Sequence, residues 1–224
     1  ADRLGRDLLS RILYGSRISL TIGLVGVTLS LVLGVIIGGI SGFYGGMIDA
    51  VVQRVIEVLR SFPTLPLWLS ISAAIPATWS NVTVYFAMTV ILSLIGWTGL
   101  ARVVRGKFLA LREEDYVAAA KVAGVRELTI IRRHLVPGFL SHLIVSVTLA
   151  IPGMILTETS LSFLRLGLRP PSISWGVLLQ DAQSLTALQL YPWLMIPALF
   201  VIITVLAFNF IGDGLRDAAD PYKI

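Results

Sequence analysis

Long uncharged runs dominate the pattern of polar and apolar positions along the chain. Charged side chains are absent from four stretches: 18–47, 61–101, 135–157 and 182–212. A segment needs about 20 apolar residues to cross the hydrocarbon core of a bilayer. The stretch 61–101 is long enough for two crossings and is interrupted by a proline and polar residues near 75–81. The pattern therefore predicts five spans, at about 18–41, 59–77, 82–104, 137–158 and 191–211.

The predicted fold class is an all-α membrane protein, a polytopic bundle of about five transmembrane helices with a cytoplasmic loop at about 105–136. Helices are expected because a backbone in lipid must satisfy its hydrogen bonds internally, and the alternation typical of barrel strands is missing. Composition agrees, since only 14% of residues are charged, against about 25% in soluble domains. The absence of cysteine excludes disulfides and thiolate metal sites.

The distribution of Lys and Arg predicts the orientation. With the N-terminus outside, the inside segments hold twelve of the eighteen basic residues, as the positive-inside rule requires. The net charge of +5 then reports orientation, and no nucleic-acid partner is expected. The outer loop would be 159–190. Residues 1–17 are expected to form an interfacial amphipathic helix, with Leu4, Leu8 and Ile12 facing lipid.

Two features of the spans concern packing. Small residues recur at every fourth position of the first span: Gly26, Ser30, Gly34, Gly38 and Gly42. This spacing makes a flat face that another backbone approaches closely, either within this chain or in a partner subunit. Prolines that bend or break helices lie in the second and fourth spans: Pro63, Pro66, Pro76 and Pro152.

The basic stretch 115–137 lies between two apolar runs. Asp115 is predicted to cap a short alanine-rich helix, and Gly124 to end it in the left-handed conformation. A second helix over 125–136 is predicted to end at Pro137, with one apolar stripe formed by Val125, Leu128, Ile131 and Leu135. Such a helix–glycine–helix elbow suits a groove in another protein. A basic loop on anionic head groups is the alternative.

The same stretch resembles the EAA loop of ABC importer permeases. Ala119, Ala120 and Gly124 hold the alanine and glycine positions of that motif, whereas Ala118 stands where the family has glutamate. The second half of the motif is matched by Ile131, His134, Leu135 and Pro137. Four further stretches resemble the dipeptide, oligopeptide and nickel branch of the family: 4–20, 61–67, 158–176 and 206–221.

The resemblance implies a permease subunit of an ATP-driven importer in a bacterial inner membrane. It implies alternating access, a second permease subunit, two ABC ATPase subunits, an extracytoplasmic substrate-binding protein and surrounding lipid. The substrate would be a di- or oligopeptide, or alternatively nickel. The chain has no phosphate-binding P-loop, so ATP and Mg²⁺ would belong to the partner ATPase and this chain would hold no cofactor or metal and catalyse no reaction. The family's first transmembrane helix is expected upstream of residue 4.

The elbow and its resemblance to the EAA loop indicate the docking residues, and the side chains themselves indicate candidates for the transport pathway. The surface that docks on the ATPase would comprise Ala118, Ala119, Ala120, Gly124, Val125, Leu128, Ile131, His134 and Pro137. Candidates for the transport pathway or its gate are Glu158, Arg165 and Trp175. Glu158 is ionisable near membrane depth and therefore a functional candidate, although it is equally placed to pair with Arg165. Arg165 departs from the family, which usually has glycine there.

Two other classes of function are weighed against transport. An intramembrane aspartic protease would use Asp213, between two glycines, with a second aspartate that shares its proton. On the inside face, Asp49 is the candidate for this second aspartate. A passive channel would need a ring of charges or carbonyls, and no such pattern occurs in the sequence.

Overall fold

The computed structural model describes residues 1–76 and 78–219, and these residues form helices and no strand. Four helices are long and apolar enough to cross a membrane: α1 (Leu8–Tyr44), α4 (Asn81–Leu111), α8 (Leu140–Phe163) and the stretch Pro192–Ala218, which joins the turn η3 (Pro192–Met195) to α11 (Ile196–Ala219). The remaining elements are α2 (Gly46–Ser61), α3 (Thr64–Ala73), α5 (Asp115–Val122), α6 (Glu127–Ile130), the π-helical turn η1 (Ile131–Leu135), α7 (Val136–Gly138), α9 (Trp175–Leu179), η2 (Gln180–Ala182) and α10 (Leu185–Leu190). The predicted all-α membrane fold is confirmed.

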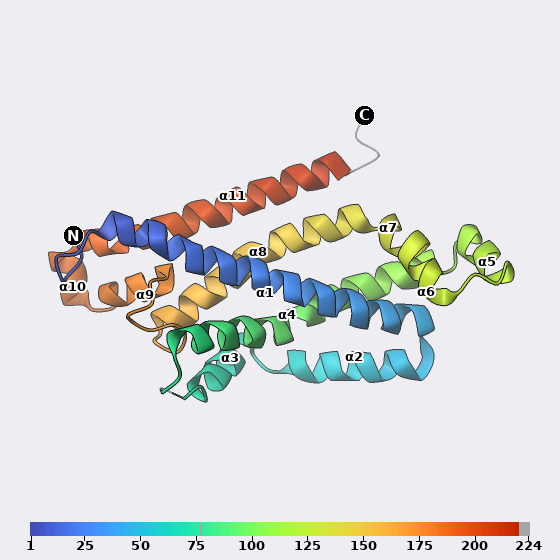
Figure 1. Ribbon diagram of the computed structural model, residues 1–224, viewed down its shortest axis with the longest axis horizontal. Coiled ribbons are helices and arrows are strands. Elements are labelled where there is room, and N and C mark those ends of the chain that lie inside the picture. The colour runs from blue at the N-terminus through green and yellow to red at the C-terminus, as the bar shows by residue number, and fades with distance from the viewer. Residues whose placement is uncertain (77, 220–224) are drawn as a thin grey trace.

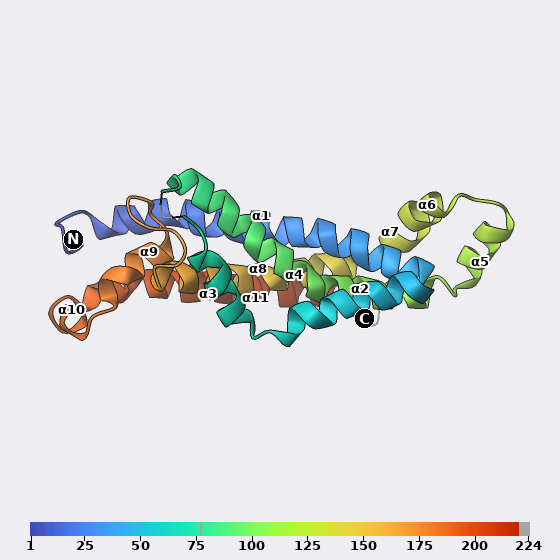
Figure 2. The same cartoon turned by 90° about the horizontal axis from the view of Figure 1, so that it is seen from below.

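The long helices run along the long axis of the molecule (Figures 1 and 2). The N-terminal end of α1 lies at one end, beside α9 and α10, and α5 and α6 lie at the opposite end. The chain therefore places its outer-loop elements and its basic stretch 115–137 at opposite ends of the bundle.

The predicted span 59–77 differs from the structure. The helix α2 ends at Ser61, and Phe62 adopts an extended conformation with φ −82° and ψ 137°. Pro63 explains this break, because a proline disfavours the helical conformation of the residue before it and carries no N–H donor. The helix α3 that follows has only 10 residues. The expectation that prolines break this segment therefore holds at Pro63, but the helix that follows is shorter than the predicted span 59–77.

The first helix is longer than predicted. Asp7 accepts a hydrogen bond from the backbone N–H of Ser10 and caps α1, which continues without a break past residue 17. Leu8 and Ile12 are buried, so the expectation that they face lipid is wrong. Their side of α1 packs against α8, α9 and α11 in the main core. Leu4 precedes the helix and is 75% exposed.

The small residues of α1 pack within this chain, mainly against α4. A Cβ atom on Gly38 would lie 2.4 Å from the backbone oxygen of Ala101, and one on Gly42 would lie 2.7 Å from that of Arg105. Towards the other end of the stripe, Gly26 faces Met154 of α8. Contact between backbones therefore fixes how closely α1 and α4 approach.

A second core, here called the elbow cluster, joins the ends of the long helices to the basic stretch. Its buried members are Phe43, Val104, Phe108, Val117, Ile130, Leu135, Phe139 and Leu143. They come from α1, α4, α5, α6, η1 and α8, and from the residue that joins α7 to α8. The elbow is therefore packed onto three of the four long helices.

Candidate functional site

The elbow, residues 115–137, begins with α5. The cap residue of this helix is Glu114, whose side chain makes no capping hydrogen bond, and Asp115 is the first helical residue. The prediction that Asp115 caps the helix is therefore wrong by one position. A carboxylate in the first turn still favours the helix, because the N-terminal end carries partial positive charge.

Gly124 ends α5 as predicted. Its φ is 72°, in the left-handed region that favours glycine. The N–H of Val125 bonds to the Ala120 oxygen at 3.0 Å, and the N–H of Gly124 bonds to the Lys121 oxygen at 3.0 Å. These are the two bonds of a Schellman motif. No heavy atom lies within 4 Å of a Cβ built on Gly124, so this corner is open.

The second half of the elbow only partly follows the predicted stripe. Leu135 is buried, and Val125 and Ile131 pack against the elbow cluster. Leu128, however, is 65% exposed, and Ile130 is buried instead. The helix begins at Glu127 and not at Val125, so the periodicity counted from Val125 does not hold for the residues after the turn.

Pro137 does not end the helix. The N–H of Val136 bonds to the Ile131 oxygen five residues back, and helix continues through Gly138. The wider π-helical turn accommodates a proline ring that would otherwise meet the preceding turn. The kink falls at Phe139, with φ −129° and ψ 16°, so the predicted stop lies two residues too early.

The outward face of α5 and the turn that follows it carries small residues at Ala118, Ala119 and Gly124. Ala118, Ala119, Gly124, Leu128 and Pro137 are exposed, and the side chain of His134 lies outside the described part of the chain. The predicted docking residues Ala120, Val125 and Ile131 pack inward instead.

Val122, on the same helix as the exposed alanines, was missed by the sequence analysis. It is 90% exposed. An apolar side chain outside the predicted stripe is the sequence feature that could have identified it.

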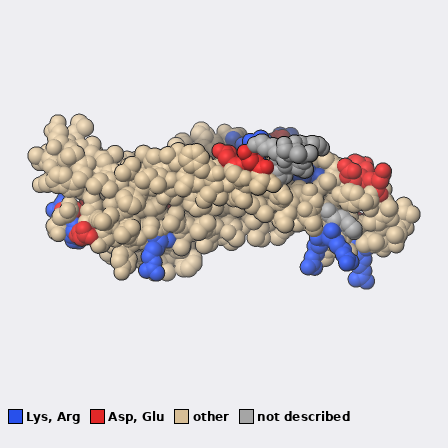
Figure 3. All heavy atoms as spheres, turned by 90° about the horizontal axis from the view of Figure 1, so that it is seen from above, with Lys and Arg blue, Asp and Glu red and all other residues tan. Residues whose placement is uncertain are grey.

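Basic side chains border the elbow. Leu128, Thr129, Arg132 and Arg133 line a shallow pocket of about 390 Å³. Figure 3 shows a largely uncharged surface, with both Lys or Arg and Asp or Glu side chains near the end that carries α5 and α6. An exposed apolar face with a basic border suits contact with a protein groove that offers apolar surface and acidic groups.

Glu158 and Trp175, two of the pathway candidates, come together at the other end of the bundle. Glu158 is fully buried, and its carboxyl oxygens accept hydrogen bonds from Ser162 Oγ at 2.8 Å and Ser19 Oγ at 3.3 Å. The backbone N–H of Trp175 donates to the same Ser19 Oγ at 3.1 Å. This polar cluster ties α1, α8 and α9 together. Arg165 is exposed, so the expected pairing with Glu158 is replaced by bonds from hydroxyl groups.

Arg165 occupies the glycine position of a second Schellman motif. Its φ is 62°, and its N–H bonds to the Ser162 oxygen while that of Leu166 bonds to the Leu161 oxygen, both at 2.9 Å. This geometry ends α8 and favours glycine at the position of Arg165. This geometry explains why the family usually has glycine at the position of Arg165.

Replacing Arg165 with glycine is expected to raise the free energy of unfolding by about 0.5–1 kcal/mol. The left-handed conformation costs a residue with a Cβ about 1–2 kcal/mol, and the greater freedom of unfolded glycine offsets up to about 1 kcal/mol. Denaturant unfolding in detergent measures the difference. Arg165→Ala is the control that removes the charge but keeps the Cβ. Equal gains in both variants would contradict the backbone explanation.

Asp49 does not have the environment of a protease aspartate. It lies on α2, and its carboxylate accepts hydrogen bonds from the Arg105 guanidinium of α4 and from Ser41 Oγ. The bond from Arg105, with smaller contributions from Ser41 and Gln53, lowers the pKa of Asp49 to about 2 against the opposing effect of burial. An ionised, paired carboxylate does not share a proton with a second aspartate, so the geometry does not favour this alternative.

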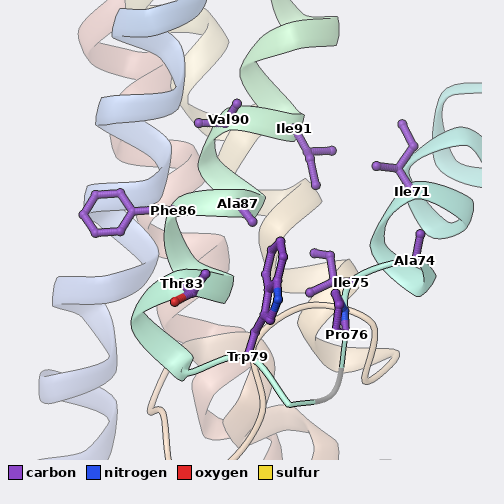
Figure 4. Close-up of a pocket in the computed structure, with 10 residues that line it drawn as sticks. All are labelled: Ile71, Ala74, Ile75, Pro76, Trp79, Thr83, Phe86, Ala87, Val90 and Ile91. Atoms are coloured by element: carbon purple, nitrogen blue, oxygen red, sulfur yellow. The ribbon is translucent and has the colours of Figure 1, made fainter.

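Two apolar hollows lie along the long helices. An open groove of about 660 Å³ runs between the end of α3 and the start of α4, with Trp79 at its centre (Figure 4). A smaller cavity of about 240 Å³ lies among α1, α3, α4 and α8, lined by residues that include Ser30, Trp68 and Thr157. Neither is lined by a charged side chain.

Comparison with known proteins agrees with the motifs. Residues 30–223 match the family described as binding-protein-dependent transport system inner membrane component. The oligopeptide transport system permease protein OppC of Haemophilus influenzae is 43% identical over 98% of this chain and 68% of its own length. The dipeptide transport system permease protein DppC of Bacillus subtilis is 40% identical over 98% of this chain and 67% of its own length.

The fold has a solved counterpart in a chain of the inward-facing MetNI methionine ABC transporter. The TM-score is 0.69 at 17% identity, with 95% of this chain and 98% of that chain covered. At this identity the likeness concerns the fold alone. The sequence matches show that the chain belongs to the family of binding-protein-dependent transport system inner membrane components, the ABC importer permeases that its motifs predicted.

Proposed function

We propose that the chain is a permease subunit through which an ATP-driven importer moves di- or oligopeptides by alternating access. The curated relatives are permeases for oligopeptides, dipeptides and glutathione, which supports a peptide substrate. A second permease subunit completes the pathway, two ABC ATPase subunits bind ATP and Mg²⁺, and an extracytoplasmic binding protein delivers the peptide. This chain contributes no cofactor and no catalytic residue.

The elbow is the docking site for the ATPase. The observation that carries this assignment is its two-sided construction. One side packs into the elbow cluster, and the other exposes Ala118, Ala119, Val122 and Gly124. A stiff, smooth projection is suited to a groove, and its attachment to the long helices allows force on the elbow to move them.

The orientation follows from the same assignment. The elbow lies in the cytoplasm, where the ATPases are, and the N-terminal end of α1 lies outside. Their placement at opposite ends of the bundle (Figure 1) supports this arrangement, as do the basic side chains near the elbow.

Replacing Gly124 with arginine is expected to remove the ATPase from the complex. The variant places a long side chain in the open corner of the elbow, where the partner surface would lie. The complex is purified from the source cells through a tag on this chain, and the ATPase retained is quantified by mass spectrometry. A loss of about tenfold is expected, because overpacking a close contact costs about 1–3 kcal/mol and 1.4 kcal/mol corresponds to a tenfold change.

Gly5→Arg is the matched control. Gly5 also has a positive φ, 77°, and no heavy atom within 4 Å of a built Cβ. It precedes α1, whose N-terminal end lies at the end of the bundle opposite the elbow (Figure 1). Both variants therefore carry the same charge and similar backbone strain. ATPase recovery that is equal in the two variants would refute docking at Gly124.

A further inference from the structure

The last residues of α1 contact the elbow, although three helices separate them in sequence. Phe43 is 8% exposed and belongs to the elbow cluster. The Lys121 Nζ atom of α5 lies 5.6 Å from the centre of the Phe43 ring, within the range of a cation–π interaction. This contact reaches from the middle of the elbow directly to the end of a spanning helix.

Two more contacts hold the same end of α1. The Tyr44 hydroxyl lies close enough to the Glu127 carboxylate of α6 to interact with it, and the Tyr44 ring packs edge-on against Phe43, with centroids 5.3 Å apart. Arg112, just after α4, donates from Nη1 to the backbone oxygens of Gly42 at 3.3 Å and Phe43 at 3.5 Å. The end of α1 is thus held from α5, from α6 and from the end of α4.

The order of the helices along the chain explains why the contact between α1 and the elbow is relevant. The elbow continues by covalent bonds into α4 on one side and α8 on the other, so any movement of the elbow reaches those two helices directly. The chain gives α1 no such link to the elbow. Backbone packing couples α1 to α4, and the contacts at Phe43 and Tyr44 add a direct link between α1 and the elbow itself. The helix α1 lines the cavity shared with α3, α4 and α8.

We propose that Phe43 and Tyr44 are positioning residues that transmit movement of the elbow to α1, with Lys121 and Glu127 as their partners. This inference rests on the proposed function, in which ATP binding moves the elbow. Nucleotide shifts the pathway only through a difference in free energy between its two states. Contacts that link the elbow to α1 let that difference in free energy act on α1, which lines the cavity together with α3, α4 and α8.

The test uses a cysteine-free chain, since the sequence contains no cysteine. A single Thr157→Cys substitution places a thiol on the cavity lining, and the complex is purified from the source cells and reconstituted in liposomes. The rate of labelling by a maleimide is measured without nucleotide and with ATP and vanadate. The ratio of the two rates reports how far the cavity responds to nucleotide.

Lys121→Met removes the cation and keeps the apolar stem, and Phe43→Leu removes the ring and keeps an apolar side chain. The ratio of labelling rates is compared only between complexes that retain the ATPase, because Lys121 lies on the elbow. In these complexes each variant is expected to bring the ratio about two- to fivefold closer to one, as expected for a lost cation–π contact. The double variant should show the same reduction in nucleotide response as either single variant, because both substitutions remove the same contact. Lys107→Met, which removes an exposed lysine of α4, is the matched control and should behave as wild type.

The outcomes separate the two proposals. A wild-type response in Lys121→Met, with the ATPase bound, would overturn the role of this contact and leave the proposed function standing. An unmodified complex that contains no ATPase, or shows no nucleotide response, would overturn the proposed function itself. If Phe43→Leu fails to fold, Lys121→Met still decides, because Lys121 is exposed and its replacement leaves the elbow cluster intact.

Discussion

Replacing Trp175 with alanine should lower the free energy of unfolding by about 4 kcal/mol, within the range for deleting a buried indole. The side chain is 2% exposed and lies in the main core. Its Nε1–H also donates to the backbone oxygen of Ile12 at 3.1 Å. The substitution therefore creates a cavity and removes a hydrogen bond at the point where α9 meets α1.

Denaturant unfolding of the purified chain in detergent measures this loss, and Trp175→Phe is its control. Phenylalanine keeps most of the ring volume and loses the Nε1–H donor, so a cost of about 1 kcal/mol is expected. A similar loss in both variants would show that the hydrogen bond, and not the packing of the ring, dominates. A loss below about 1 kcal/mol in Trp175→Ala would contradict the assignment of Trp175 to the core.

The long apolar helices could be predicted from the sequence because hydropathy is a local property. The uncharged runs located α1, α4, α8 and α11, and Gly124 was identified because a short alanine-rich helix followed by glycine is a local signal. The break at Pro63 was visible too, since three prolines lie in that stretch. The sequence did not show, however, that the helix after this break would have only 10 residues.

The polar cluster at the end of the bundle opposite the elbow could not be predicted. Glu158 was selected as an ionisable group near membrane depth, but its partners, Ser19 and Ser162, are common residues without a sequence signal. Trp175 donates a hydrogen bond to the backbone oxygen of Ile12. Every residue has a backbone oxygen, so the sequence does not indicate which one accepts this bond. The contact of Lys121 with Phe43 is hidden in the same way, because it joins segments far apart in sequence.

The beginning of α1 shows how charge patterns mislead near a helix end. Four arginines within residues 1–17 suggested a separate interfacial segment. The helix instead continues through this region with Leu8 and Ile12 turned inward. A helix with one buried face accommodates charges on its other faces, so arginines do not by themselves mark a boundary.

Replacing Gly38 with alanine should lower the free energy of unfolding by about 3 kcal/mol, at the upper end of the range for overpacked cores. The added Cβ would lie 2.4 Å from the Ala101 oxygen and 2.8 Å from its Cα. These are backbone atoms, so no side-chain rotation relieves the contact. The helices α1 and α4 must move apart, which also loosens their contacts at Gly34 and Gly42.

Gly106→Ala provides the matched control, because Gly106 lies on α4 and no heavy atom is within 4 Å of a Cβ built there. Alanine is favoured over glycine inside a helix by about 0.5–1 kcal/mol, so this variant should be slightly more stable than wild type. Unfolding in detergent compares the two substitutions directly. Opposite signs at Gly38 and Gly106 are expected, since the same methyl group meets a backbone at one site and open space at the other. A stabilised Gly38→Ala variant would show that α1 and α4 do not pack through their backbones.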